Sequence, residues 1–211
     1  MPYLKREAEN PEPIDCRILT AALNLFVANG YHNVSVHEIQ KLGNVSIGSI
    51  YNHFGGKDGI AKALYDHIIN EIDELVDDVV SNFNSPLKQV EEIIRQLFEH
   101  TESHSNIIAF AFHAKHPEFL HEDALICKTA PFIKIRDIVE AAMEQDELRR
   151  TNTWVATSTI FGGMIRMIQL RLDGVIEEPL PEYYSMLIDT ILGGLKKQET
   201  NAESLVIAAV S

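Results

Sequence analysis

Apolar residues recur every three or four positions along nearly the whole chain, which is the spacing of an amphipathic helix, while the two-residue alternation of a half-buried strand is nearly absent. The pattern predicts an all-α protein of about nine helices. The first begins with Asp15 as its N-cap, and Pro131 predicts a break or kink in a later one. The expected helices cover residues 15–29, 35–42, 46–53, 86–102, 105–115, 118–147, 152–173 and 181–197, with one long helix between Gly56 and Ser85.

Two short segments in the first quarter of the chain carry strong signals for helix ends. Ser35 and Glu38 have the spacing of a capping box, in which each side chain bonds the other residue's backbone N–H. Gly43-Asn44 ends the first segment because both residues tolerate a left-handed backbone, and Ser46 caps the second segment. Residues 35–54 therefore form a predicted helix-turn-helix, the geometry that lays a second helix in the major groove of DNA.

The second helix of this motif presents small and polar groups. Ile50 and Phe54 are expected to face the core. The outward-facing residues are expected to be Ser46, Ile47, Ser49, Tyr51 and His53. Hydroxyls and free amides at helix N-termini favour phosphate, and Lys57 adds a cation close by. Capped helix hairpins are also common structural units, so geometry alone leaves both DNA binding and a purely structural hairpin open.

Charge changes this picture only slightly. The 211-residue chain has a formal net charge of −13, which by itself argues against nucleic acid as a partner. However, residues 1–60 carry five positive and six negative side chains, whereas residues 61–211 carry 13 and 25. Distance and screening can keep an acidic C-terminal part away from phosphates. The distribution therefore permits DNA binding through the N-terminal part without predicting it.

Several classes of protein are disfavoured by composition. Cys16 and Cys127 are the only cysteines, far apart, so a disulfide framework or a cysteine zinc site is not expected. Residues 1–13 lack the apolar run of a signal peptide, and the uncharged stretch 151–165 is too short to span a bilayer. These features predict a reduced, cytoplasmic protein with no membrane contact.

The helix-turn-helix segment resembles a known family. The string Val-Ser-x-Gly-x-x-Tyr-x-His-Phe-x-x-Lys runs from Val45 to Lys57, and Gly30-Tyr31, Ser35-Val36 and Ile39 precede it. This pattern is similar to the DNA-binding domain of the TetR family of bacterial regulators. The similarity extends without a gap over about residues 14–60.

The resemblance implies a homodimeric transcriptional repressor that binds a palindromic operator in double-stranded DNA and is released by a small-molecule effector. It divides the chain into an N-terminal arm (1–13), a three-helix DNA-binding domain (14–60) and a helical effector-binding and dimerisation domain (61–211). It makes Ser35 and Lys57 phosphate contacts. The residues it places at or near the major groove are Ser46, Ile47, Gly48, Ser49, Tyr51, Asn52 and His53.

Three positions depart from the family pattern. Ile47 stands where a lysine or another polar residue is frequent, and its side chain can touch only an apolar base edge such as a thymine methyl. Asn44 replaces a glycine but still adopts the left-handed turn. Gly56 replaces a capping residue and predicts a less firmly started fourth helix. The operator sequence cannot be carried over from the family.

The last two predicted helices are unusually apolar, which suggests a dimer interface made by a pair of helices. The alternative is that both are core helices. The residues expected at the interface are Gly162, Gly163, Tyr184, Ile188 and Ile191. The apolar tail 204–211 has no assigned role.

An effector pocket is expected between the long fourth helix and the helices that begin near Pro86, Ser105 and Asn152. The candidate lining residues are Phe98, Phe110, His113, Trp154 and Phe161, with plain core packing as the alternative for each. Because the C-terminal part lacks a basic cluster, an apolar or cationic effector is favoured over a strongly anionic one.

The histidines support a rival interpretation. His100 and His104 would share a helical face, as a zinc pair does, and three further members of the cluster are His113, His116 and His121. No HExxH string, nucleophile elbow or phosphate-binding loop accompanies them, so neither a metal or other cofactor nor an enzymatic activity is expected. The alternatives to a regulator are a ligand-binding or interaction protein that no longer recognises DNA and, more remotely, a metal-dependent enzyme.

Overall fold

The structure is a computed structural model that describes residues 3–4, 11–112 and 126–196. These residues form nine α-helices and no strand, so the predicted all-α fold is confirmed. The helices are α1 (Ile14–Asn29), α2 (Val36–Gly43), α3 (Ile47–Phe54), α4 (Lys57–Asn82), α5 (Pro86–Ser103), α6 (Ser105–Phe112), α7 (Ala130–Glu144), α8 (Thr153–Leu172) and α9 (Tyr184–Gly193), with 3₁₀ turns η2 (Ile126–Lys128) and η3 (Leu180–Tyr183).

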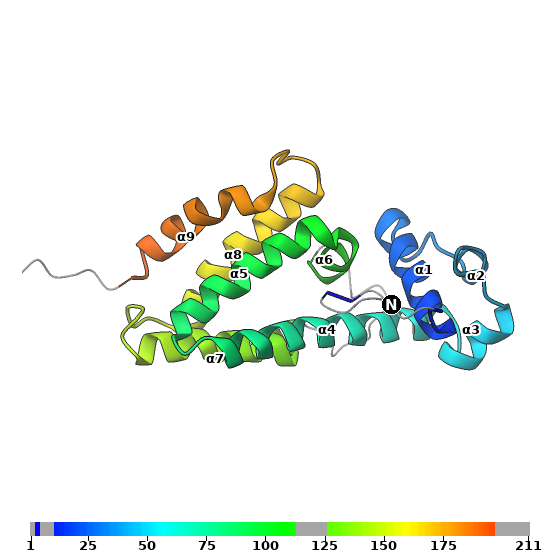
Figure 1. Cartoon of the computed structure of the whole chain (residues 1–211), viewed down its shortest axis with the longest axis horizontal. Coiled ribbons are helices and arrows are strands. Elements are labelled where there is room, and N and C mark those ends of the chain that lie inside the picture. The colour runs from blue at the N-terminus through cyan, green and yellow to red at the C-terminus, as the bar shows by residue number, and fades with distance from the viewer. Residues whose placement is uncertain (1–2, 5–10, 113–125, 197–211) are drawn as a thin grey trace, which may run out of the picture.

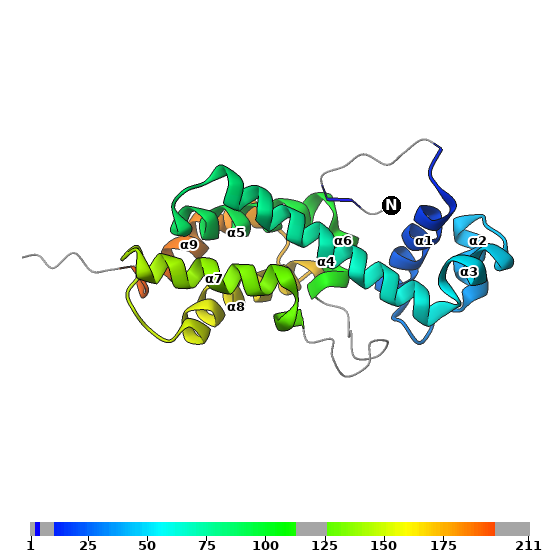
Figure 2. The same cartoon turned by 90° about the horizontal axis from the view of Figure 1, so that it is seen from below.

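The helices form two groups joined by α4 (Figures 1 and 2). We call α1–α3 with the first two turns of α4 the N-terminal domain, and the rest of α4 with α5–α9 the C-terminal domain. Helix α4 packs on α1 and α3 at its beginning and on α5, α6 and α7 further along. It therefore belongs to both domains.

One apolar stripe explains this double role of α4. Ile60 and Leu64 are fully buried in the N-terminal domain, and Ile68, Ile72 and Leu75 continue the same helical face into the C-terminal domain. All five belong to one continuous hydrophobic core. The helix thus connects the two domains through packed side chains rather than through a flexible linker.

Ionic contacts tie α7 to α4. The Lys134 ammonium on α7 lies 2.8 Å from a carboxylate oxygen of Asp73 and 2.6 Å from one of Asp77, both on α4. Helix α7 also buries three apolar side chains in the core, namely those of Ile135, Ile138 and Val139. The long helix is therefore held on the C-terminal side by both apolar and ionic contacts.

Three predicted boundaries differ from the structure. Pro131 does not kink a helix over 118–147, because α7 begins at Ala130 and the proline occupies its first turn, where no backbone donor is needed. Residues 118–125 lie outside the described residues. Asp15 is in the first turn of α1 rather than its N-cap, which is Pro13. The last predicted helix is divided into η3 and α9, and the tail 204–211 lies outside the described residues.

Among the described residues, no helix is long and apolar enough to cross a membrane.

The first turn of α4 tolerates only glycine at position 59, because it packs against the end of α3. A Cβ atom there would lie 1.7 Å from the Phe54 carbonyl oxygen, which is backbone and cannot rotate away. We expect Gly59→Ala to lower the free energy of unfolding by at least about 3 kcal/mol, measured by chemical denaturation. Gly48→Ala is the matched control, because a Cβ at position 48 meets only the Ser46 hydroxyl at 3.7 Å. The control should raise stability by about 0.5–1 kcal/mol, and equal effects of the two changes would contradict this account.

Candidate nucleic-acid interface

Helix α2 begins with the predicted capping box. The Ser35 hydroxyl accepts the Glu38 backbone N–H at 3.3 Å, and a Glu38 carboxylate oxygen accepts the Ser35 backbone N–H at 2.7 Å. The same oxygen accepts the Ser35 hydroxyl at 2.7 Å. These side-chain and backbone hydrogen bonds from Ser35 lower the pKa of Glu38. The Ser35 hydroxyl is therefore committed to the helix end, and its predicted phosphate contact stays a prediction.

The turn between α2 and α3 is closed by local backbone chemistry. Asn44 adopts the left-handed conformation with φ 48°, as its sequence position predicted. Gly43 packs against α1, where a Cβ atom would lie 3.3 Å from the Arg17 carbonyl oxygen. The Gln40 side chain donates to the Val45 carbonyl at 2.9 Å. The turn therefore fixes the direction in which α3 leaves α2.

Arg17 on α1 clamps this turn, and the sequence analysis missed it. Its guanidinium donates two hydrogen bonds to the Gly43 carbonyl, at 3.0 and 2.8 Å, and a further one to the Asn44 carbonyl. A cation at the C-terminal end of α2 also complements the helix dipole. A single arginine in an amphipathic helix gives no sequence signal for such a role, because its partners lie 26 and 27 positions away.

Helix α3 presents the predicted recognition residues on its outer side. Ser46 is the N-cap, and its hydroxyl accepts the Ser49 backbone N–H at 3.0 Å. Ile50 is buried as expected, and Tyr51 is 54% exposed. The predicted recognition residues with at least intermediate exposure are Ser46, Ile47, Gly48, Ser49, Tyr51, Asn52 and His53. The structure thus brings all seven onto one short, capped, outward-facing helix.

Lys57 is occupied by the protein itself. Its ammonium donates to the carbonyls of Tyr31 at 3.1 Å and Val34 at 2.9 Å, and lies 4.2 Å from the centre of the Tyr31 ring. The Tyr31 hydroxyl in turn donates to Asp58. Burial, followed by this hydrogen bond, raises the pKa of Tyr31. Lys57 therefore holds the 31–34 loop against the start of α4, and its phosphate contact stays a prediction.

The predicted effector residues lie in different environments. Phe98, Phe110 and Phe161 are buried side chains of the core. Trp154 is 55% exposed, and the Arg136 guanidinium lies 5.1 Å from the centre of its ring system. His113 lies outside the described residues. Their assignment to an effector pocket therefore stays a prediction.

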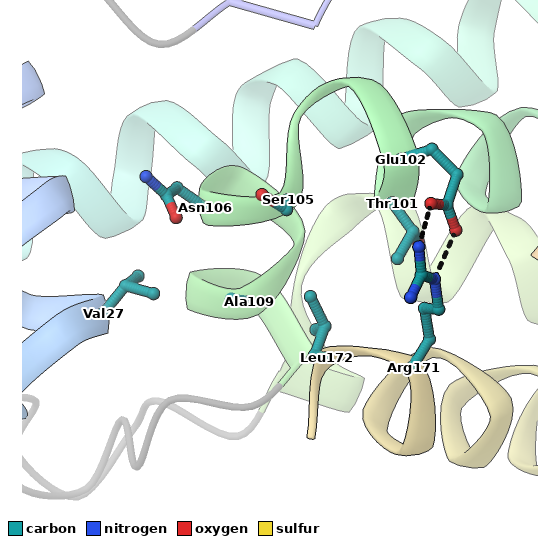
Figure 3. A pocket seen from close by; sticks show the side chains of 8 residues that line it. All are labelled: Val27, Thr101, Glu102, Ser105, Asn106, Ala109, Arg171 and Leu172. Carbon is teal, nitrogen blue, oxygen red and sulfur yellow. Dashed lines mark hydrogen bonds and ion pairs between the residues drawn. The ribbon is translucent and has the colours of Figure 1, made fainter. Parts of the chain in front are cut away.

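A half-open cleft of about 480 Å³ lies where the two domains meet (Figure 3). Its lining comes from α1, α5, α6 and α8, and consists of Val27, Thr101, Glu102, Ser105, Asn106, Ala109, Arg171 and Leu172. The Arg171 guanidinium binds both carboxylate oxygens of Glu102, at 3.0 and 2.8 Å, which lowers the pKa of that carboxyl. Near the opposite wall, the Asn106 amide donates to the Asn24 side chain at 2.8 Å. Helix α6 thereby contacts the N-terminal domain directly.

The predicted dimer residues divide into two sets. Ile188 and Ile191 are buried in the core of this chain, and a Cβ atom on Gly163 would lie 3.3 Å from Ile191. Tyr184 donates from its hydroxyl to the Glu91 carbonyl at 3.2 Å. Gly162 is exposed, with nothing within 4 Å of a Cβ atom placed on it. Packing within one chain accounts for most of this apolar surface, and a contact with a second copy stays a prediction.

His100 and His104 of the histidine cluster lie side by side where α5 ends. The Nδ1 atoms of His100 and His104 lie 3.4 Å apart, and the Ser103 hydroxyl lies 2.8 Å from the His104 Nδ1. His113, His116 and His121 lie outside the described residues. Within the described parts of the chain, no three histidine, cysteine or acidic side chains are grouped closely enough to hold a metal ion.

Comparison with known families gives one match at the N-terminal end. Residues 18–64 match the model of the family described as bacterial regulatory proteins, tetR family. The transcriptional regulator UidR of Escherichia coli K12, described as of the helix-turn-helix type, is 38% identical over 53 residues. That alignment covers 25% of this chain and 27% of UidR. The chain therefore matches only about a quarter of the length of this curated relative.

Solved structures resemble the chain over most of its length. A TetR family transcription regulator from Marinobacter aquaeolei has a TM-score of 0.75 at 12% identity, and covers 88% of this chain and 96% of its own. The regulator FadR from Bacillus subtilis, solved in complex with stearoyl-CoA, has a TM-score of 0.68 at 18% identity, over 84% and 97%. At these identities the likeness establishes the fold of both domains and nothing finer.

Because Arg17 clamps the turn between α2 and α3, replacing it should destabilise the protein. We expect Arg17→Ala to lower the free energy of unfolding by about 1–3 kcal/mol, because two backbone carbonyls lose a charged donor. Urea denaturation followed by circular dichroism measures the change. Arg150→Ala removes an exposed arginine with no such clamp and should leave stability within about 0.5 kcal/mol of the parent. If both variants unfold at the same urea concentration as the parent, Arg17 is not a clamp.

Proposed function

We propose that this chain, which belongs to the TetR family of bacterial regulatory proteins, is a DNA-binding transcriptional regulator whose helix α3 enters the major groove. The observation that carries the proposal is the geometry of α2 and α3. Both helices are capped, the turn between them is clamped by Arg17, and α3 exposes its polar side while Ile50 anchors the other. A helix held this rigidly can present base-reading side chains in a fixed register.

The proposed contacts follow from what each side chain offers. Tyr51, Asn52 and His53 can meet base edges or the sugar-phosphate backbone, and Ile47 can meet a thymine methyl. The N-terminal amides of α2 and α3 suit phosphates because the caps Ser35 and Ser46 are exposed and the positive end of a helix dipole lies at the N-terminus. Two N–H groups of Lys57 are occupied by carbonyls, which leaves one for a phosphate.

We further propose that the protein acts as a homodimer on a palindromic operator. Two copies of α3 would then enter successive major grooves about 34 Å apart. The exposed parts of α8 and α9, including Gly162 and Met186, are the proposed contact. Such a dimer represses when bound and releases DNA when an effector favours a different spacing of the two α3 helices.

We place effector binding in the C-terminal domain; that a similar structure, FadR, was solved in complex with stearoyl-CoA supports the binding of an effector. In this chain, a displacement of helices in the C-terminal domain can be transmitted to the N-terminal domain through two sets of contacts. One is α4, whose apolar stripe is shared by both domains, and the other is the contact between Asn106 on α6 and Asn24 on α1. A coupling free energy of about 1–3 kcal/mol between effector and DNA would suffice for regulation.

Selection of binding sites from random duplex DNA at low salt tests the proposal. We expect enrichment of a palindrome whose half-sites are one helical turn apart. Repeating the selection with protein that has been unfolded and refolded removes any co-purified effector. In the opposing outcome, the refolded protein is folded but enriches no sequence. That result would favour the alternative, a helical ligand-binding protein that no longer recognises DNA, and the apolar Ile47 on α3 would fit it.

Tyr51 is the most informative single residue on α3. We expect Tyr51→Ala to weaken binding to the selected site by about 5- to 150-fold without changing the unfolding midpoint, because the ring is exposed and packs little in the free protein. Fluorescence anisotropy with labelled duplex measures the affinity. Val80→Ala, an exposed apolar residue of α4, is the control and should bind DNA like the parent. Unchanged binding by Tyr51→Ala would show that α3 is not the recognition helix.

The dimer proposal predicts different effects for two equally exposed apolar residues. Met186 on α9 is 65% exposed and lies on the proposed contact, whereas Val175 is 67% exposed and lies in the turn after α8. We expect Met186→Glu to weaken self-association by about 100-fold or more, since a dimer would bury two unpaired carboxylates. Val175→Glu should leave association unchanged. Sedimentation equilibrium distinguishes the two, and equal association of both variants would place the interface elsewhere.

A further inference from the structure

The cleft between the two domains is a different place from the predicted effector pocket. Of the predicted effector residues that the structure describes, none lines it. Its walls come from α1 of the N-terminal domain and from α5, α6 and α8 of the C-terminal domain. Its volume of about 480 Å³ is within the range of pockets that bind small molecules, roughly 300–1,000 Å³. The cleft therefore has the size of a site for a small molecule in contact with both domains.

The charged groups of this cleft neutralise each other. Arg171 on α8 binds both carboxylate oxygens of Glu102 on α5, and one of these oxygens also accepts the Leu180 backbone N–H at 3.0 Å. The hydrogen bonds between the two side chains lower the pKa of Glu102 and raise the pKa of Arg171, so both stay charged at neutral pH. The remaining lining residues are uncharged. A bound anion would meet the carboxylate and a bound cation the guanidinium, so the cleft favours a neutral ligand.

Arg171 still has hydrogen-bond donors to offer a ligand. A guanidinium carries five N–H groups. Two of them bind Glu102 and a third donates to the Ile176 carbonyl at 3.3 Å, which leaves one N–H on Nη1 and one on Nη2. In Figure 3 the guanidinium nitrogen without a dashed line points towards the Leu172 side of the cleft. This wall therefore suits an uncharged acceptor such as a carbonyl oxygen.

The opposite wall, where α6 begins, offers acceptors. The Asn106 side-chain nitrogen donates to the Asn24 side-chain oxygen on α1 at 2.8 Å, and this bond fixes the orientation of the Asn106 amide. In Figure 3 the Asn106 oxygen lies on the side of the amide nearer to Val27. Within the described parts of the chain, neither this oxygen nor the Ser105 hydroxyl makes a hydrogen bond. This wall therefore suits a ligand group that donates, such as a hydroxyl.

The rest of the lining is apolar or already satisfied. Val27 on α1, Ala109 on α6 and Leu172 on α8 contribute aliphatic side chains. The Thr101 hydroxyl donates to the Leu97 carbonyl at 2.7 Å and is therefore not a donor for a ligand. Aliphatic groups of a ligand gain free energy when such surfaces remove them from water. The cleft thus combines a donor wall, apolar side chains from three helices and an acceptor wall.

We propose that this cleft binds a neutral aliphatic molecule with a carbonyl group at one end and a hydroxyl group at the other, of which an ω-hydroxy amide is the simplest form. The carbonyl accepts an Arg171 N–H, the hydroxyl donates to the Asn106 oxygen, and the methylene groups lie against Val27, Ala109 and Leu172. Such a ligand contacts α1 and α8 at once and stabilises one relative position of the two domains. An effect on DNA binding rests on the proposed regulatory function, but the binding of the amide does not.

The test uses the full chain and the probe 6-hydroxyhexanamide. Three controls have the same chain length: 6-hydroxyhexanoate is an anion, 6-aminohexan-1-ol is a cation, and hexanamide lacks the hydroxyl. Binding is measured from ¹H–¹⁵N NMR shifts of Ser105, Ala109 and Leu172. We expect the probe to bind at least about tenfold more tightly than either charged control, and about two- to tenfold more tightly than hexanamide. Equal affinity of the probe and the charged controls at these residues, or no shift with the probe, would overturn the proposal.

One substitution tests the acceptor wall. Asn106→Ala should reduce the affinity for 6-hydroxyhexanamide to that for hexanamide and leave hexanamide binding unchanged, because only the hydroxyl loses its partner. Asn33→Ala, which removes another exposed asparagine, should keep the preference of the parent. A preference for the hydroxyl that survives Asn106→Ala would contradict the assignment. Asn106 is exposed, so the variant is expected to fold, and the comparison of the four compounds on the parent needs no variant. Operator binding is measured separately, so an absent amide site and an absent DNA-binding activity give different results.

Discussion

The shared apolar stripe of α4 is the constraint on which the rest of this structure depends. Because Ile60 and Leu64 pack in the N-terminal domain and Ile68, Ile72 and Leu75 pack in the C-terminal one, neither domain can rotate without moving the other or breaking the stripe. Packed interiors resist gradual deformation, so α4 transmits displacement as a rigid element. The proposed regulation therefore requires only that an effector change the angle at which α4 leaves the C-terminal domain.

Two basic side chains of the N-terminal domain bind backbone carbonyls of the domain itself. Among residues 11–60, all of which the structure describes, Arg17 holds the helix-turn-helix turn and Lys57 holds the 31–34 loop through backbone carbonyls. Lys41 remains as the exposed basic residue of this segment. Affinity for DNA would then come largely from helix N-termini and polar side chains, which suits an acidic protein that has few positive charges to offer phosphates. Under the proposed function, this domain would contribute rigidity rather than charge to the recognition of DNA.

Sequence reasoning succeeded where the determining contacts are local. The capping box of Ser35 and Glu38, the left-handed Asn44 and the cap at Ser46 each involve residues at most three positions apart, so their spacing in the chain predicts their geometry. It failed where the hydrogen-bond partners are distant in the sequence, as for Arg17. It also failed where one residue type is compatible with two different positions in a helix. Pro131 both breaks helices and begins them, and only the tertiary course of the chain selects the second use.

Glu71 belongs to the same class of residues that a sequence cannot explain. Along α4 its position reads as part of a helix with mixed charge, since Glu74, Asp77 and Asp78 follow it on the solvent side. Its burial becomes visible only when residues 3–4, nearly seventy positions earlier, are folded onto the helix. Burying a carboxylate costs free energy unless hydrogen bonds or a cation compensate it, and the Leu4 N–H supplies one such bond from a part of the sequence that no local pattern links to α4.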